Sequence, residues 1–245
     1  MSVATKTIAS AYVLAALVLW QPVYASGSLV INTTGIPPLN SADQAGFMDR
    51  VAAEALRRMD IKLKTVQLPA ERGLQNVNAG IDDGEMSRIA GLHKQYPNLV
   101  QVPETIMDWE FHAFAAKSLK PVKKWSDLAD YSVAFIRGWK IVEKNVPRSS
   151  IVITVKNPLQ LFELLKKQRT EVVVYERWGG LKLIDQFGLS GVKIIQPPLA
   201  QKKMYMYLHK KHAGLVPALA SKLKQMKADG SYKKIYDETL GLYVK

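Results

Sequence analysis

The stretch that decides the fold is IVITVKNPLQLFELLKKQRTEVVVYERWGGLKLIDQF, residues 151–187. Two short β-branched runs, Ile151–Val155 and Glu171–Tyr175, predict strands, and a segment with helical spacing follows each of them. The first of these helices begins at Pro158, a residue that favours the first turn of a helix. Strands that alternate with helices at this spacing predict an α/β fold with largely parallel sheets.

The same alternation extends in both directions from this stretch. The other expected strands are residues 29–34, 61–68, 83–89, 99–102, 109–116, 131–136, 192–195 and 204–208. The other expected helices are residues 46–60, 70–79, 138–145 and 215–228. We therefore expect an α/β architecture over nearly the whole chain.

The N-terminus has the pattern of a secretory signal peptide. Lys6 precedes an apolar run of 13 residues, Ile8–Trp20, and small residues lead to a cleavage site near Ala25. A membrane anchor is the alternative, but the run is short of the roughly 20 residues that span a bilayer. We therefore predict that residues 1–25 are removed and that the mature protein is periplasmic.

Composition narrows the class of protein. The chain has 245 residues, of which 48% are apolar and 22% charged, and this excludes a largely disordered chain. It has no cysteine, which excludes disulfides, thiolate metal sites, a cysteine nucleophile and a lipid anchor through cysteine.

The net charge of +13 suggests nucleic acid, an anionic membrane surface or small anionic solutes as partners. Export argues against nucleic acid. Residues 118–200 hold 14 basic and 7 acidic side chains, and residues 201–245 hold 10 and 3, so the excess lies in the second half of the chain. It is compatible with steering of anionic solutes or with docking to an acidic membrane protein.

Seven short motifs, among them GFMD, GIDDG, WSDLADYSVA and EVVVYE, occur along the chain. Their positions are Leu29–Ile31 with Pro37–Pro38, Gly46–Asp49, Gly80–Gly84, Lys117 with Trp125–Ala134, Arg137–Gly138, Glu171–Glu176 and Leu215–Gly241. Because it carries these motifs in this order, the chain resembles the exported solute-binding proteins of family 3, which are the polar amino-acid-binding components of ABC importers. Each motif alone is weak, and the order makes the resemblance specific.

The resemblance implies a two-lobed, periplasmic binding protein-like fold of type II. Each lobe would be a mixed, mostly parallel sheet flanked by helices, and two crossover strands would form the hinge. Lobe 1 would be residues 29–113 plus 203–245, and lobe 2 residues 117–200. A small polar solute, an amino acid or a related carboxylate, would bind in the cleft between them. A monomer would then deliver it to the membrane permease of an ABC importer.

The carboxylate of such a solute calls for an arginine, whose planar fork makes two parallel charge-assisted bonds. The resemblance implies this role for Arg88, with Ser87 in place of the usual threonine hydroxyl. A surface arginine is the alternative. Arg72, at a strand-to-helix turn, could also meet an anionic solute, or it could pair with Glu71 or Glu85.

The ammonium group of an amino acid calls for a carboxylate, and Glu176 follows the strand Glu171–Tyr175. The family that the chain resembles usually has an aspartate at this position. The longer glutamate moves the charge, so the identity of the solute is not determined. The alternative is an acid that only stabilises a helix N-terminus.

Aromatic side chains are expected as walls of the cleft, because such sites are largely apolar. Trp109 and Trp139 are the first candidates. Beside Trp139, Arg137 and Gly138 precede a predicted helix whose backbone N–H groups could meet a carboxylate.

Other chemistry has little support in the sequence. His209 and His212 have helical spacing, but two lysines separate them, so we expect no metal site. Phosphate-binding, dinucleotide and serine-hydrolase motifs do not occur, and we expect no cofactor and no catalytic residues.

Three other functions stay open beside transport, and one of them is binding to a membrane surface through the lysines. The other two share the predicted scaffold. The first is an enzyme on the same scaffold, of dehydratase or lyase type, with Glu176 or Glu85 as acid or base. The second is a ligand-sensing partner of a membrane receptor.

Overall fold

The computed structural model describes residues 27–116 and 120–244. The predicted signal peptide, residues 1–25, and Lys117 lie outside the described residues. Over the described ranges, no helix combines the length and the apolar character needed to cross a membrane.

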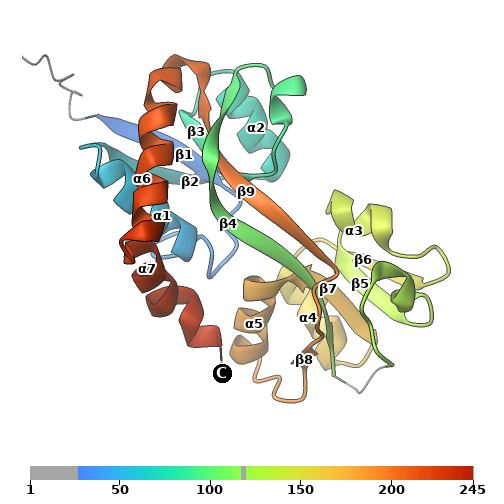
Figure 1. Cartoon of the computed structure of the whole chain (residues 1–245). Helices are drawn as coiled ribbons and strands as arrows, with labels where there is room; N and C mark the ends of the chain where they lie inside the picture. Colours follow the sequence, from blue (N-terminus) through green and yellow to red (C-terminus); the bar gives the residue numbers. More distant parts are fainter. Residues whose placement is uncertain (1–26, 117–119, 245) are drawn as a thin grey trace, which may run out of the picture.

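Strands and helices alternate as the sequence predicts (Figure 1). The strands are β1 (Ser28–Thr33), β2 (Lys62–Gln67), β3 (Gly84–Arg88), β4 (Leu99–Ala115), β5 (Ser132–Ile136), β6 (Ile151–Val155), β7 (Val172–Glu176), β8 (Lys193–Ile194) and β9 (Ala200–His209). The α-helices are α1 (Phe47–Arg57), α2 (Ala70–Asn78), α3 (Lys140–Asn145), α4 (Pro158–Lys166), α5 (Arg177–Gln186), α6 (Val216–Ala228) and α7 (Ser231–Thr239). Short 3-10 helices are η1 (Leu92–Lys94), η2 (Trp125–Leu128), η3 (Lys210–Leu215) and η4 (Leu240–Tyr243).

The strands form two parallel groups joined by an antiparallel centre. Their order is β2-β1-β3-β9-β4-β7-β5-β6, with β8 paired to β4. β1 runs parallel to β2 and β3, and β5 runs parallel to β6 and β7. β4 and β9 are antiparallel to each other and extend from one group to the other (Figure 1). The α/β fold with two lobes and two crossover strands is thus confirmed.

Lobe 1 consists of β1–β3 with α1, α2, α6 and α7. Lobe 2 consists of β5–β7 with α3–α5. The residue boundaries 29–113 plus 203–245 and 117–200 stay a prediction.

The first crossover differs from the sequence expectation. Two separate strands were expected at residues 99–102 and 109–116, but β4 is one strand of 17 residues. Pro103 lies inside it, and the pairing with β9 shifts register between Gln101 and Thr105 and again between Thr105 and Met107. A proline cannot donate to the ladder, so the strand continues through irregularities instead of ending there.

Lobe 2 has an aromatic core beneath the end of its sheet. Phe114, Phe162 and Tyr175 are at most 2% exposed. The ring of Phe162 meets those of Phe114 and Tyr175 edge-on, with centroid distances of 5.6 Å and 5.9 Å. Tyr175 lies near the carboxyl end of β7, so this core fixes a large side chain at the end of the strand.

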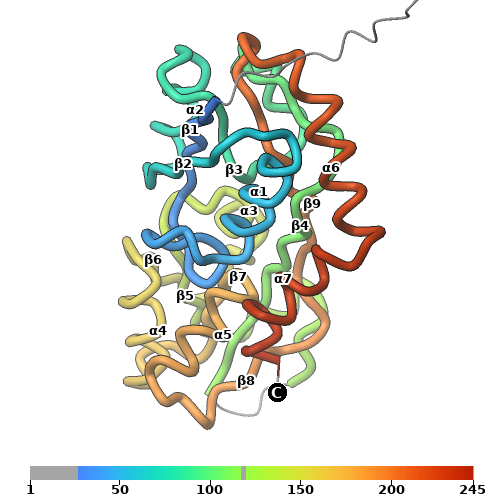
Figure 2. Tube along the Cα trace, turned by 90° about the vertical axis from the view of Figure 1, so that its left-hand side faces the viewer, coloured from blue at the N-terminus to red at the C-terminus, as the bar shows by residue number. Residues whose placement is uncertain are grey.

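The C-terminal helix contacts both lobes. Phe47 of α1 and Trp178 of α5 each meet Tyr236 of α7 edge-to-face, at centroid distances of 6.1 Å and 5.6 Å. Figure 2 shows that α6 and α7 run along one side of the molecule and that the chain ends beside lobe 2. Helix α7 therefore bridges the lobes on a second side, in addition to β4 and β9.

The close approach of β3 to β9 gives a first prediction. A Cβ atom on Gly84 would lie 2.5 Å from the backbone oxygen of Tyr207 and 2.7 Å from Cδ1 of Ile31. Because a backbone atom cannot rotate away, we expect Gly84→Ala to lower the free energy of unfolding by about 1–3 kcal/mol. Chemical denaturation of the variant and the wild type measures this.

Gly191→Ala is the matched control, because no atom lies within 4 Å of a Cβ at that position. It should stay within about 0.5 kcal/mol of the wild type. Equal stability of Gly84→Ala and the wild type would contradict the close packing of β3 on β9.

Candidate functional site

A cavity of about 620 Å³ lies between the two lobes and is the candidate site. Lobe 1 contributes Thr34, Gly35, Ile36, Pro37, Pro69 and Ala70 to its lining. Lobe 2 contributes Ile136, Arg137, Gly138, Trp139, Lys156, Pro158, Leu159, Tyr175, Gly179, Lys182, Leu183 and Gln186. Most of these residues lie at or just after the carboxyl ends of β1, β2, β5, β6 and β7, where open α/β sheets place their ligands.

An aromatic stack forms one wall of this cavity. The rings of Trp139 and Tyr175 are stacked, with centroids 4.8 Å apart and planes 14° apart. Phe111 of β4 meets Trp139 edge-on at 5.7 Å. Tyr175 is 2% exposed, and burial raises the pKa of its hydroxyl. The stack is therefore anchored in the core of lobe 2 and presents a rigid flat surface.

Arg137, Gly138 and Trp139 lie together at the cavity, at the turn that follows β5. Gly138 has φ +89°, a left-handed conformation that favours glycine. Its N–H donates to Oε1 of Glu143 at 2.7 Å, so this group already has an acceptor. A carboxylate contact through this N–H stays a prediction.

Glu176 ends β7 and is fully buried. Its Oε1 accepts from the N–H of Trp178 at 3.0 Å and its Oε2 from the N–H of Gly179 at 2.8 Å, so it caps α5. Burial raises the pKa of this carboxyl to about 7, although the two hydrogen bonds oppose the shift. These contacts are those of a helix-capping acid. Gly179 lines the cavity, but Glu176 does not, and its contact with a ligand ammonium stays a prediction.

Arg88 and Ser87 lie at the carboxyl end of β3 and do not line the cavity. Nη2 of Arg88 lies 2.9 Å from Oε1 of the buried Glu85 and donates to the carbonyl of Ala70 at 3.1 Å. The Oγ of Ser87 is buried and has no hydrogen-bond partner among the described residues. Ala70 does line the cavity, so the guanidinium of Arg88 contacts the backbone of a lining residue without lining the cavity itself.

Glu85 is 1% exposed, and the ion pair with Arg88 lacks the alignment of a hydrogen bond. Burial outweighs the nearby guanidinium and raises the pKa of the Glu85 carboxyl to about 8. Burial therefore favours the protonated form of this acid more than that of an ordinary carboxyl, and the Arg88 guanidinium opposes this effect.

Arg72 and Trp109 lie outside the interlobe cavity. Arg72 is exposed on α2, and in the part of the chain that the structure describes it forms no ion pair. Trp109 lines a neighbouring hollow of about 520 Å³, together with Phe111, Lys140 and Lys202. Their contact with a ligand stays a prediction.

Of the lining residues, only Arg137, Gly138 and Trp139 were candidate site residues in the sequence; the residues missed include Lys156, Tyr175 and Lys182. Lys156 directly follows β6 and Tyr175 belongs to β7, so the carboxyl ends of the predicted strands were the available signal. Lys182 lies in the middle of α5, where the sequence gives no comparable signal.

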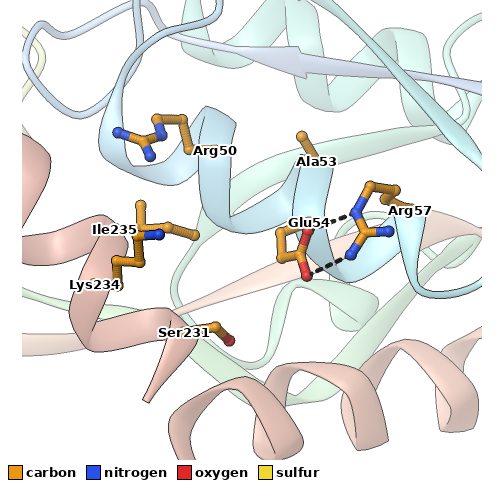
Figure 3. A pocket seen from close by; sticks show the side chains of 7 residues that line it. All are labelled: Arg50, Ala53, Glu54, Arg57, Ser231, Lys234 and Ile235. Atoms are coloured by element: carbon orange, nitrogen blue, oxygen red, sulfur yellow. Dashed lines mark hydrogen bonds and ion pairs between the residues drawn. The ribbon is translucent and has the colours of Figure 1, made fainter. Parts of the chain in front are cut away.

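A second hollow, of about 470 Å³, lies on the outside of lobe 1 between α1 and α7 (Figure 3). Its cations are neutralised from within the protein. Arg57 lies 2.7 Å from Glu54, and Arg50 forms an ion pair with Glu238. Figure 3 shows the two bonds from Arg57 to Glu54. The charges of this groove are thus satisfied without a ligand.

His209 and His212 form hydrogen bonds with other groups of the protein. Nε2 of His212 lies 2.7 Å from Oδ1 of Asp83, and Nδ1 of His209 accepts from the N–H of Lys211. Across residues 27–116 and 120–244, no three histidine, aspartate or glutamate side chains come together as metal ligands would.

Comparison with known proteins shows similarity of fold at low sequence identity. No family model matches the chain. An uncharacterized protein of Shewanella oneidensis is 24% identical over 196 residues, which are 77% of this chain and 74% of that protein.

Solved structures are similar over most of the chain. An ancestral arginine-binding protein bound to arginine has a TM-score of 0.72 and 21% identity, over 87% of this chain and 98% of that one. A histidine kinase sensor domain with similarity to periplasmic binding proteins has a TM-score of 0.70 and 16% identity, over 87% and 96%. The substrate-binding protein of an amino acid ABC transporter has a TM-score of 0.65 and 16% identity, over 87% and 99%. This chain has the fold of these proteins.

The buried acid Glu85 generates a prediction about pH. Its carboxyl has a pKa of about 8 in the folded protein against an ordinary 4.5, so unfolding releases a proton between these values. The stabilising effect is complete below about pH 4.5 and is lost as the pH rises towards 8. One such group lowers the free energy of unfolding by up to about 1.4 kcal/mol per pH unit in this window.

Glu85→Gln should flatten this dependence when unfolding is measured from pH 5 to 8. Glu176, with a pKa of about 7, acts with the same sign, so part of the slope remains. Glu163→Gln is the control, because the Lys167 ion pair lowers the pKa of Glu163 and removes its titration from this window. A wild-type slope in Glu85→Gln would contradict a protonated Glu85.

Proposed function

We propose that this chain, which has the two-lobed fold of periplasmic binding proteins, is an exported solute-binding protein. It captures a small polar solute, an amino acid or a related carboxylate, in the cavity between the lobes. The observation that carries the proposal is that cavity. Its lining comes from the carboxyl ends of parallel strands in both lobes, and its volume of about 620 Å³ falls within the range of small-molecule sites.

The hinge strands β4 and β9 supply the mechanism. These two strands pair with each other and connect the lobes. Each lobe carries part of the cavity lining, so bending within the strands changes the width of the cavity. A solute that contacts both walls stabilises the closed form. In the proposed role, a monomer in the periplasm presents this closed form to the membrane permease of an ABC importer. The resemblance of the motifs and the similarity to an amino acid transporter's binding protein support this role.

Two other functions use the same cavity. A sensing role, in which the closed form binds a membrane receptor, has support in the similarity to a kinase sensor domain. An enzyme of dehydratase or lyase type would need Glu176 or Glu85 as acid or base. Glu176 is engaged by two backbone N–H groups and Glu85 lies against Arg88, so the geometry favours binding over turnover.

A thermal-shift screen of the mature protein against amino acids and small carboxylates tests the proposal. A ligand that binds only the folded state raises the melting temperature. Recovery of the ligand unchanged supports binding, and its conversion to product supports the enzyme. If no compound in these classes shifts the melting temperature, the proposed function is wrong.

The aromatic wall gives a prediction for any ligand that the screen finds. Trp139→Ala removes the half-buried ring that stacks on Tyr175. It should weaken binding by about tenfold or more, since the lost aromatic contact contributes about 1 kcal/mol and the lost apolar burial adds to this. Trp139→Phe keeps a flat ring and should retain most of the affinity. Calorimetric titration measures both, and unchanged affinity in Trp139→Ala would exclude the wall from the site.

The predicted carboxylate contact of Arg88 is tested with a pair of variants. Arg88→Gln leaves the buried Glu85 without its partner, so a loss of binding in this variant alone could reflect a disturbed fold. The double variant Glu85→Gln/Arg88→Gln removes both groups. If Arg88 binds the solute, both variants lose the ligand-induced thermal shift. If the double variant keeps the wild-type shift, Arg88 has only a structural role.

A further inference from the structure

The charges around the interlobe cavity have one sign. Its lining contains Arg137, Lys156 and Lys182, and it contains no aspartate or glutamate. None of the three cations forms an ion pair with any described carboxylate. They come from three different elements, the ends of β5 and β6 and helix α5, and they converge on one hollow. Arg137 donates to the hydroxyl of Thr154 at 3.4 Å, and a hollow lined by three cations and no acid favours an anion.

Some basic side chains elsewhere in the described residues form ion pairs and others do not. In the groove between α1 and α7, Arg50 and Arg57 are paired with Glu238 and Glu54 (Figure 3). Next to the cavity, Lys140 is paired with Glu143 at 2.8 Å. Unlike the groove between α1 and α7, which Glu54 lines, the interlobe cavity has no aspartate or glutamate in its lining.

Asp43 of lobe 1 has a pKa below its ordinary value, mainly because of hydrogen bonds from the hydroxyl of Ser41 and the N–H of Ala45. The charge of Lys182 makes the smallest contribution to this shift. Asp43 does not line the cavity, so Lys182 remains available to a bound anion.

An ammonium group would find no acceptor of opposite charge in the lining. The carboxylate that could serve is Glu176, but both of its oxygens accept backbone N–H groups of α5 and the side chain is fully buried. A zwitterion would also place its ammonium beside Arg137, Lys156 or Lys182. The stacked rings of Trp139 and Tyr175 could attract a cation, but the same three positive charges oppose this.

The remaining surface of the cavity suits a flat apolar group. The rings of Trp139 and Tyr175 are stacked, and the lining also includes the apolar residues Ile36, Pro37, Pro69, Pro158, Leu159 and Leu183. A planar ring fits between aromatic and proline faces.

We infer that the solute is an aromatic carboxylate without an ammonium group, and that Arg137, Lys156 and Lys182 hold its anionic end while the Trp139–Tyr175 stack holds its ring. This inference rests on the proposed function, because it names the class of solute that the interlobe cavity takes. It narrows that function from amino acids in general to carboxylates that carry a ring and no amine.

A set of matched compounds tests the inference by calorimetric titration of the mature protein. The set is 3-phenylpropionate, L-phenylalanine, phenethylamine and propionate, which differ in the presence of the carboxylate, the amine and the ring. We expect 3-phenylpropionate to bind at least tenfold more tightly than L-phenylalanine and propionate, and phenethylamine to show no binding. Equal or tighter binding of L-phenylalanine would overturn the inference.

L-arginine and the other polar amino acids are titrated in the same way, for comparison with the aromatic carboxylates. If one of them binds and 3-phenylpropionate, phenylacetate and benzoate do not, the inference is wrong and the proposed solute-binding function stands. If no amino acid and no carboxylate binds, both are wrong.

Variants of one lysine separate the charge effect from the fold. Lys182→Gln should weaken 3-phenylpropionate binding by about tenfold, and Lys182→Glu should weaken it further and shift the preference towards phenethylamine. Lys193→Gln is the control, because Lys193 is an exposed lysine of the same lobe outside the cavity lining. Equal affinities of Lys182→Gln and Lys193→Gln for 3-phenylpropionate would overturn the assignment of the anionic end.

Discussion

The antiparallel ladder between β4 and β9 is the constraint on which the rest of the structure depends. It pairs Leu99 with His209 at one end and Phe111 with Ala200 at the other, and from Phe111 onward β4 also pairs with β7. The parallel strands of lobe 1 join this ladder through β3, and those of lobe 2 join it through β7. The carboxyl ends of both groups therefore contribute to one cavity.

Local patterns were sufficient to predict most of the elements. Pro158 begins α4, and the β-branched run before Glu176 forms β7, because both depend on residues next to them in the chain. The continuity of β4 could not be predicted in this way. Pro103 and the polar residue after it indicate a break, and the strand persists only because β9 supplies partners on both sides of the irregularity. A contact between residues about a hundred positions apart overrides the local signal.

In the candidate site too, the residues that depend on local patterns could be predicted, and those that depend on long-range packing could not. Arg137, Gly138 and Trp139 could be predicted because they follow a strand that the sequence shows clearly, and the structure brings them to the cavity. Lys182 could not, because its position depends on how α5 packs against lobe 2. The pairing of Arg88 with Glu85 also depends on burial, which a sequence pattern does not reveal for two charged residues. Arg72, Arg88, Ser87 and Trp109 therefore stay predictions for ligand contact, as does Glu176.

The aromatic contact at the C-terminus has a consequence for observing the molecule. Tyr236 meets Phe47 of lobe 1 and Trp178 of lobe 2, and these three rings border a hollow of about 380 Å³ on the side of the hinge. A rotation of one lobe against the other must change how the indole of Trp178 is packed and solvated there. In a variant whose other described tryptophans, Trp109, Trp125 and Trp139, are replaced by phenylalanine, the fluorescence of the Trp178 indole would report on the hinge angle from a position outside the interlobe cavity.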